Sequence, residues 1–235
     1  MRFSVDLEDF STSQFEARTD FISEFSLDLF RELFLPFAES LDLFVVSSIL
    51  KSDQYSEVIS ELLSAGASLG SHGHSHVRMD KISISDLDYE FSMSKDLLEN
   101  TFNREVSVFR PPGFLLNNAA LRSCEKHHYK SIDGYHRLKF RGKIQKSGLR
   151  LQAPPNICGL PIGGGYLRRL YMASPIVAEK IAKNRGFYLH PWELIESQKL
   201  LKLGVNWGKK SYKLRGCGPQ YSKFLAGMLE RNNGA

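Results

Sequence analysis

Apolar and polar residues recur along the chain in two periods, one typical of strands and one typical of helices. Residues 2–6 alternate in polarity and are rich in strand formers, which predicts a half-buried strand. Residues 26–41 carry apolar side chains at intervals of three and four, which predicts an amphipathic helix. Residues 43–46 are a continuous apolar run and predict a strand buried on both faces.

The same order of helix and strand patterns continues along the chain. We predict a capping box formed by Ser85 and Asp88 at the start of one helix, and loops or an inserted hairpin over the basic, Gly- and Pro-interrupted residues 137–156. The further predicted helices are 55–65, 85–102, 117–127, 174–184 and 221–231, and the further predicted strands are 67–69, 106–109, 129–132 and 186–189.

Strands that alternate with helices indicate repeated βα units and an α/β fold with a largely parallel sheet or barrel. Parallel sheets collect functional side chains at the carboxyl ends of their strands. Asp6, His72 and Arg110 each follow a predicted strand. We therefore expect these three residues to meet in space.

Composition narrows the class of protein. The 235 residues are 42% apolar and 24% charged, as in an ordinary globular protein, and are expected to form a single domain. The formal charge is +5, with basic residues crowded into 137–150 and 199–215, but no nucleic-acid recognition motif accompanies them, so a solvated face or contact with a phosphorylated or membrane partner is expected instead. The three cysteines form no Cys-x-x-Cys pair, and no secretory leader or membrane-spanning stretch is visible, which predicts a cytoplasmic protein.

Three of the seven histidines fall within residues 70–76, in the sequence GSHGHSH. His72 and His76 are four residues apart, a spacing that lets two imidazoles reach one cation, whereas His74 is expected to point elsewhere. Two nitrogens rarely hold a catalytic metal alone, so an acidic third ligand is required. A metal held this way, with an open position, activates water for hydrolysis, helped by a second carboxylate as base and another histidine as acid.

Four motifs in order resemble those of the polysaccharide deacetylase family, carbohydrate esterase family 4. They are SVDLED at residues 4–9, GSHGHSH at 70–76, FRPPG at 109–113 and YLHPWE at 188–193. LPIGGGYLR at 160–168 and YKSID at 129–133 resemble the subgroup whose first motif reads Asp-Val-Glu-Asp. The resemblance implies an irregular (β/α)7-type barrel, with a motif-bearing core over residues 3–194 and a closing segment over 195–235.

The resemblance also implies a role for each motif residue. Asp6 would be the general base, Arg110 would orient it, and His190 would be the general acid. His72 and His76 would bind a divalent metal, with zinc expected. The third ligand would be Glu8 or Asp9: Asp9 has the family's ligand type, and Glu8 is an almost equal alternative.

Several other residues are expected to contact the substrate or to support the site. Pro112, Phe114 and Tyr166 are assigned to the substrate cleft, with a backbone N–H near Phe114 binding the oxyanion and Tyr166 at the cleft rim beside Arg168. Leu189 and Trp192 are expected to form the pocket for an acetyl methyl group. Asp133 would orient His190 or would simply belong to a turn.

These expectations describe a hydrolase that removes an N-acetyl group from an amino sugar and releases acetate. The expected substrate is an N-acetylated sugar nucleotide, lipid-linked sugar or oligosaccharide, with no nucleic acid as partner and with peripheral membrane contact left open. The alternatives are a metal-independent hydrolase of a non-sugar amide and a catalytically silent glycan-binding module.

Overall fold

The computed structural model describes residues 1–8, 27–134, 147–157, 160–163, 165–202 and 214–233. Seven strands form one all-parallel sheet in the order β6-β5-β4-β3-β2-β1-β9, and a separate two-stranded antiparallel hairpin follows β6. The strands are β1 (Phe3–Leu7), β2 (Leu41–Val45), β3 (Ser68–Ser71), β4 (Val108–Phe109), β5 (Ser131–Asp133), β6 (Arg150–Gln152), β7 (Asn156–Ile157), β8 (Leu160–Pro161) and β9 (Phe187–Leu189).

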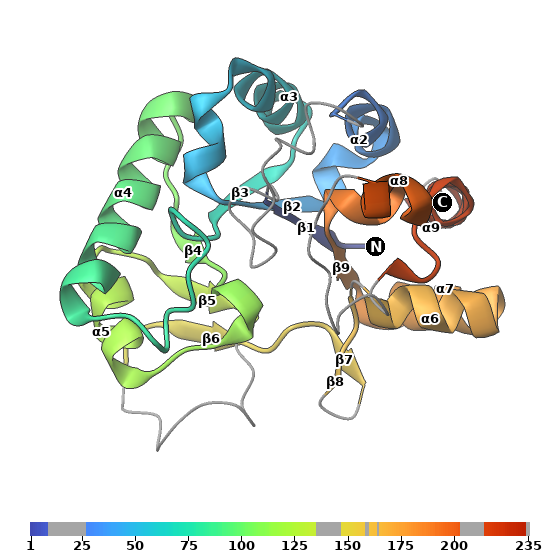
Figure 1. Ribbon diagram of the computed structural model, residues 1–235. Helices are drawn as coiled ribbons and strands as arrows, with labels where there is room; N and C mark the ends of the chain where they lie inside the picture. Colours follow the sequence, from blue (N-terminus) through green and yellow to red (C-terminus); the bar gives the residue numbers. More distant parts are fainter. Residues whose placement is uncertain (9–26, 135–146, 158–159, 164, 203–213, 234–235) are drawn as a thin grey trace.

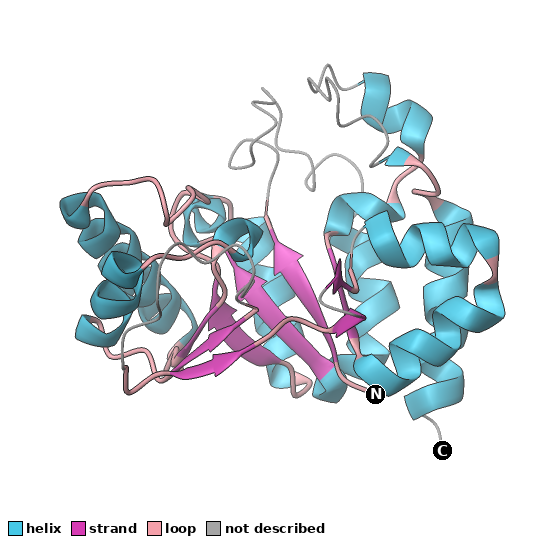
Figure 2. Ribbon diagram, turned by 90° about the horizontal axis from the view of Figure 1, so that it is seen from below, coloured by secondary structure: helices cyan, strands magenta, loops and turns pink. Residues whose placement is uncertain are grey.

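The sheet curls into an open barrel with helices on its outside (Figure 1). In Figure 2 its strands point upward from the end at which the N-terminus lies. The α/β class and the irregular (β/α)7-type barrel predicted from the sequence are therefore confirmed. The helices are α2 (Leu27–Phe34), α3 (Asp53–Ser64), α4 (Ile84–Phe102), α5 (Asn118–Lys126), α6 (Gly165–Ala173), α7 (Pro175–Arg185), α8 (Ser197–Lys202) and α9 (Pro219–Asn233).

Strand β1 is the centre of this arrangement because it pairs with β2 on one side and with β9 on the other. Leu7 lies opposite Val45 of β2, and Val5 lies opposite Leu189 of β9. This register places the residues that follow the three strands at one end of the barrel. The Phe3 ring stacks on the Phe187 ring at 5.5 Å, which joins β1 to β9 through the core.

Three features depart from the sequence-based prediction. Within residues 137–156, where loops or a hairpin were predicted, β6 joins the sheet as an additional parallel strand beside β5. Residues 165–173 form helix α6 where a cleft-rim loop was expected. Helix α4 is capped by Ser83, whose hydroxyl accepts the Asp86 N–H, and not by the predicted Ser85 and Asp88 pair, so the correct capping spacing was placed two residues too late.

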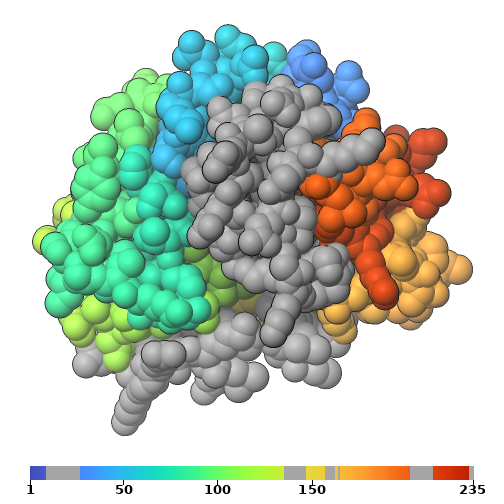
Figure 3. Space-filling view, viewed as in Figure 1, coloured from blue at the N-terminus to red at the C-terminus, as the bar shows by residue number. Residues whose placement is uncertain are grey.

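The two halves of the chain lie on different sides of the molecule. Figure 3 shows the segments up to α5 on the left and top, in blue to green, and the C-terminal segments on the right, in orange and red. In the part of the chain that the structure describes, no helix combines the length and apolar character needed to cross a bilayer.

Candidate active site

His72 is fixed by backbone hydrogen bonds at the end of β3. Its own N–H donates to the Val45 carbonyl at 2.9 Å, and its Nδ1 lies 2.8 Å from the Arg110 carbonyl. Because a carbonyl only accepts, Nδ1 carries the proton and Nε2 is left as a free lone pair, as in histidines that ligate metals. Burial lowers the pKa of His72 to about 4, so this imidazole is neutral at neutral pH.

The rest of the histidine loop is held by Glu90 of helix α4. One carboxylate oxygen of this buried side chain accepts the His74 N–H at 2.8 Å and the Ser75 N–H at 3.0 Å, and the other accepts the Ser75 hydroxyl. The His74 Nδ1 lies 2.9 Å from the Ser47 hydroxyl, so this ring points away from His72 and His76, as expected. Gly73 has a φ of +86° in the turn, a conformation that favours glycine.

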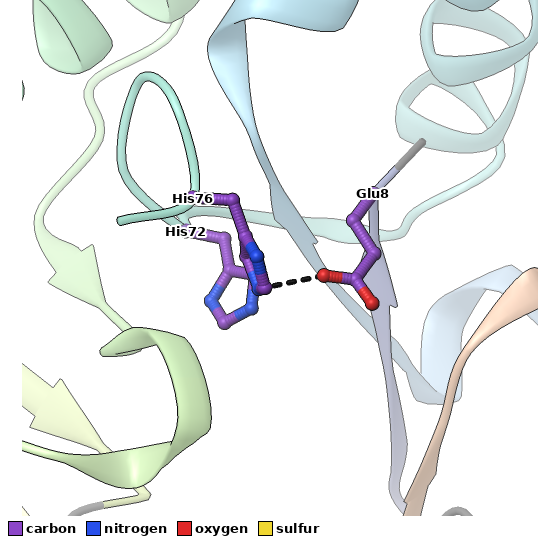
Figure 4. A group of neighbouring side chains, drawn as sticks. All are labelled: Glu8, His72 and His76. Atoms are coloured by element: carbon purple, nitrogen blue, oxygen red, sulfur yellow. Dashed lines mark ion pairs between the residues drawn. The ribbon is translucent and has the colours of Figure 1, made fainter. Parts of the chain in front are cut away.

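Glu8, His72 and His76 come together after β1 and β3, with one ligand atom of each within 4.8 Å of the others (Figure 4). The His76 Nε2 lies 2.6 Å from the Glu8 carboxylate. One carboxylate and two imidazoles, one of them held neutral with a free Nε2, form a donor set that fits zinc or a similar divalent metal. Asp9, the preferred acidic ligand from the sequence, lies outside the described residues.

Asp6 is buried beside this group and paired with Arg110. The Arg110 Nη1 donates to the Asp6 carboxylate at 2.5 Å, and Nη2 donates to Asp133. Burial acts to raise the pKa of Asp6, but the positive charge of Arg110, with His72 and His190, outweighs it and holds that pKa below its usual value. Asp133 therefore supports Arg110, and the prediction that it orients His190 is wrong.

His190, directly after β9, is oriented by Glu193. The His190 Nδ1 lies 2.9 Å from the Glu193 carboxylate, which also accepts the backbone N–H of His190 at 3.0 Å. Glu193 is in turn paired with Arg168 of α6, and both side chains are completely buried. Arg168 is thus part of the support for His190 and not of an exposed cleft rim, which corrects its predicted place.

The other ring nitrogen of His190 faces Asp6 of β1 and Glu8, which directly follows that strand. Its Nε2 lies 3.9 Å from Asp6 and 3.8 Å from Glu8. Burial acts to lower the pKa of His190, but the hydrogen bond to Glu193 and the charges of Glu8, Glu193 and Asp6 outweigh it and raise the pKa above its usual value. A proton donor therefore lies across from a buried carboxylate.

The residues expected to contact the substrate are placed as follows. Leu189 and Trp192 are buried, and the Trp192 ring stacks on His190 at 5.2 Å. Pro112 is buried as well. Phe114 packs edge-on against Tyr188. The N–H of Phe114 itself donates to the Pro111 carbonyl at 2.8 Å, and an oxyanion donor among the backbone N–H groups near it stays a prediction.

Tyr166 is half-buried at the start of α6, and its N–H donates to the Gly163 carbonyl at 3.0 Å.

Two acidic residues that support the site, Glu90 and Glu193, were not predicted from the sequence. Glu193 had a signal, because it lies three residues after His190 and can reach back to it as a helix N3 residue reaches its cap. Glu90 had none, since it lies within a helix pattern 14 residues beyond His76 and only the folded chain brings it to the loop.

Part of the chain matches a known protein family. The sequence profile of the polysaccharide deacetylase family matches residues 40–132, which include His72, His76 and Arg110. This part of the chain resembles the polysaccharide deacetylase family. Asp6, Glu8 and His190 lie outside the matched range and are joined to it by the pairing of β1 with β2 and β9. No curated protein sequence gives a match.

Solved structures share the fold at low sequence identity. A carbohydrate esterase family 4 pseudoenzyme from Bacillus anthracis superposes with a TM-score of 0.54 at 11% identity, over 100% of this chain and 60% of that one, so the chain spans about three fifths of its length. A mutant of a peptidoglycan deacetylase from Bacillus subtilis gives 0.52 at 10% identity, over 98% and 83% of the two chains. A family 4 carbohydrate esterase from Streptomyces lividans in complex with acetate gives 0.50 at 13% identity, over 97% and 88%.

Proposed function

We propose that this chain is a member of the polysaccharide deacetylase family and a metal-dependent hydrolase that removes the N-acetyl group of an amino sugar. One observation carries the proposal: a buried carboxylate with its arginine, a Glu/His/His group and a second histidine with a raised pKa converge at one end of the barrel. A silent binding module has no physical need for all of these groups. The carboxylate of Asp6, whose pKa is lowered, lies opposite the imidazole of His190, whose pKa is raised, and this pair suits acid–base catalysis.

In this proposal Glu8, His72 and His76 hold a divalent metal, most simply zinc. Bound there, such an ion would supply a Lewis acid for the amide carbonyl and lower the pKa of a water molecule. The Arg110 carbonyl fixes the tautomer of His72, and Glu90 fixes the loop that carries His76. Asp9 remains the alternative acidic ligand.

Asp6 is proposed as the general base. Arg110 keeps its carboxylate ionised and fixes its position, so that it can take a proton from the attacking water. His190 is proposed as the general acid that protonates the departing nitrogen, because Glu193 holds the proton on Nδ1 and the surrounding carboxylates favour the protonated ring. The sugar leaves as a free amine and the acyl group as acetate.

The proposed substrate class rests on the apolar residues beside His190 and on the net charge of the chain. Leu189 and Trp192 supply an apolar surface next to His190 for the acetyl methyl group. A formal charge of +5 suits a phosphate-bearing carrier, which favours a sugar nucleotide or a lipid-linked precursor over a neutral polymer, and a cytoplasmic site of action.

Acetate release from a panel of nucleotide- and lipid-linked N-acetylhexosamines tests the proposal, with metal content measured before and after chelation. We expect about one metal per chain, chelator-sensitive release, and a loss of at least about 100-fold in Asp6→Asn, as is typical when a general base is removed. Release that survives chelation would point to a metal-independent amidohydrolase. A metal-free protein that binds glycans without releasing acetate would instead be a binding module, a relevant outcome because the Bacillus anthracis pseudoenzyme shares the fold.

A further inference from the structure

The barrel contains a cavity of about 640 Å³ at the end opposite the candidate metal site. Its lining comes from the first residues of the strands, among them Ser4 of β1, Asp42 of β2 and Ser68 of β3, and from the end of helix α7. This is the lower end of the sheet in Figure 2, where the N-terminus lies. Glu8, His72 and His76 instead follow the carboxyl ends of β1 and β3.

The cavity exists because the inward-facing positions of this barrel layer are small and polar. Barrels of parallel strands are usually filled at these positions by bulky branched side chains. Side chains alternate along a strand, so Ser4 lies on the same face of β1 as Asp6, and Ser131 lies on the same face of β5 as Asp133. Gly70 adds no side chain at all, and a Cβ there would come within 2.6 Å of the Phe44 ring.

The inner boundary of the cavity is Arg110, which is also the partner of Asp6. Its guanidinium lies 3.8 Å from the centre of the Phe44 ring, and its Nε is buried with no hydrogen-bond partner among the described residues. The cavity therefore combines an apolar surface at Phe44 with an unused buried N–H and several hydroxyl and carboxamide groups. Such a lining suits a ring that carries hydroxyl groups.

The mouth of the cavity is positively charged. The two carboxylates of its lining are already neutralised, Asp42 by Arg2 at 2.5 Å and Asp133 by Arg110. Lys183 and Arg185 at the end of α7 are exposed and form no salt bridge within the described ranges, although the charge of Lys183 acts on Glu179. Two cations at an open polar cavity are suited to a phosphate group.

We propose that this cavity binds a small phosphorylated sugar, with the phosphate at Lys183 and Arg185 and the sugar hydroxyls on the polar lining of the barrel. The site is separate from the candidate metal site and does not depend on the proposed deacetylation. Arg110 lines the cavity and also pairs with Asp6.

Isothermal titration calorimetry of the full chain with glucose 6-phosphate tests this site, with glucose and inorganic phosphate as separate arms. We expect measurable binding of glucose 6-phosphate and at least about tenfold weaker binding of either part, because each part lacks one set of contacts. The double variant Lys183→Gln, Arg185→Gln should weaken binding at least about tenfold. Lys180→Gln is the matched control, since Lys180 is exposed on the same helix and does not line the cavity.

Two further variants separate the possible failures. Ser68→Trp places a large ring at the mouth, where Ser68 is exposed, and should block the sugar while the protein stays folded by circular dichroism. Glu8→Gln should leave the titration unchanged. Loss of binding in Glu8→Gln would place the ligand at the metal site and overturn the proposal, as would equal binding of inorganic phosphate, no heat in any arm, or full binding in both cavity variants.

Discussion

His72 and His190 are held in different ways in the two halves of the barrel. In the first half, β1 to β5, His72 is placed by its backbone N–H, which donates to the Val45 carbonyl, and by its ring Nδ1, which donates to the Arg110 carbonyl. In the second half, His190 is placed by a chain of side chains that runs from Arg168 through Glu193. Backbone carbonyls at neighbouring strand ends thus hold His72, whereas a buried ion pair supports His190.

The strands that precede the two histidines differ in their pairing. β3, which precedes His72, pairs with β2 over four residues, whereas β9, which precedes His190, pairs with β1 over only three. The backbone after β9 is therefore held by few ladder hydrogen bonds. The Arg168 and Glu193 pair, which is completely buried, supplies the missing restraint.

Removal of Arg168 should therefore have the largest effect. Arg168→Met leaves the Glu193 carboxylate buried without its cation, which costs about 3–5 kcal/mol in the free energy of unfolding. Urea denaturation measures this loss, and the neighbouring variant Arg169→Met, at an exposed position, should stay within about 0.5 kcal/mol of the parent. Equal stabilities of the two variants would refute the idea that the second half depends on this pair.

The next largest effect concerns the metal ligands of the first half. Glu8→Gln removes the carboxylate charge from the Glu8, His72 and His76 group and should weaken metal affinity at least about 100-fold, more than the usual cost of losing a supporting residue. Competition with a chelator of known affinity measures the change. Asp9→Asn is the matched variant, and a greater loss there than in Glu8→Gln would make Asp9 the ligand.

The sequence allowed most of the first half to be predicted because its patterns are local. Periodicity located α3, α4 and α5 to within two residues at each end, and the spacing of His72 and His76 indicated a shared cation. These patterns depend only on residues that are adjacent in the sequence: the histidine cluster, the strand ends and the loop glycines. The proximity of Asp6 and Arg110 was expected from their places near strand ends, and their pairing from the resemblance to the family.

The second half was predicted less well because its decisive contacts join residues that are distant in sequence. Arg168 was assigned to a cleft rim because it follows the glycine-rich residues 159–165. Its partner Glu193 lies 25 residues further along the chain, and only the fold brings the two together. The strand β6 is three residues long and lies after a basic segment, so its pattern was too short to read. Asp133 was expected either to orient His190 or to belong to a turn, whereas its side chain pairs with Arg110.

A smaller loss is expected when the histidine loop is released from α4. Glu90→Ala removes three hydrogen bonds to His74 and Ser75 and should weaken metal affinity by about 10–100-fold, as is typical for residues that orient ligands. Chelator competition and the unfolding midpoint should be measured together, so that a change in affinity is separated from a change in stability. Asp96→Ala, exposed on the same helix, should change neither, and an unaltered affinity in Glu90→Ala would mean that the loop is held by its backbone alone.

The smallest expected effect is a pH dependence in the regular half. Glu99 is partly exposed; burial acts to raise its pKa, but hydrogen bonds from Lys95 and the Val106 N–H lower it below its usual value of 4.5. The unfolded chain then binds more protons, so this stabilisation is present above the unfolded pKa and is lost as the pH falls through the lower folded pKa. Glu99→Gln should reduce stability at pH 7 by no more than about 1 kcal/mol and flatten the acid limb of stability against pH. Glu105→Gln, which removes only an exposed pair with Lys130, should leave that limb unchanged. An equal change in both variants would contradict the assignment of this pH dependence to Glu99.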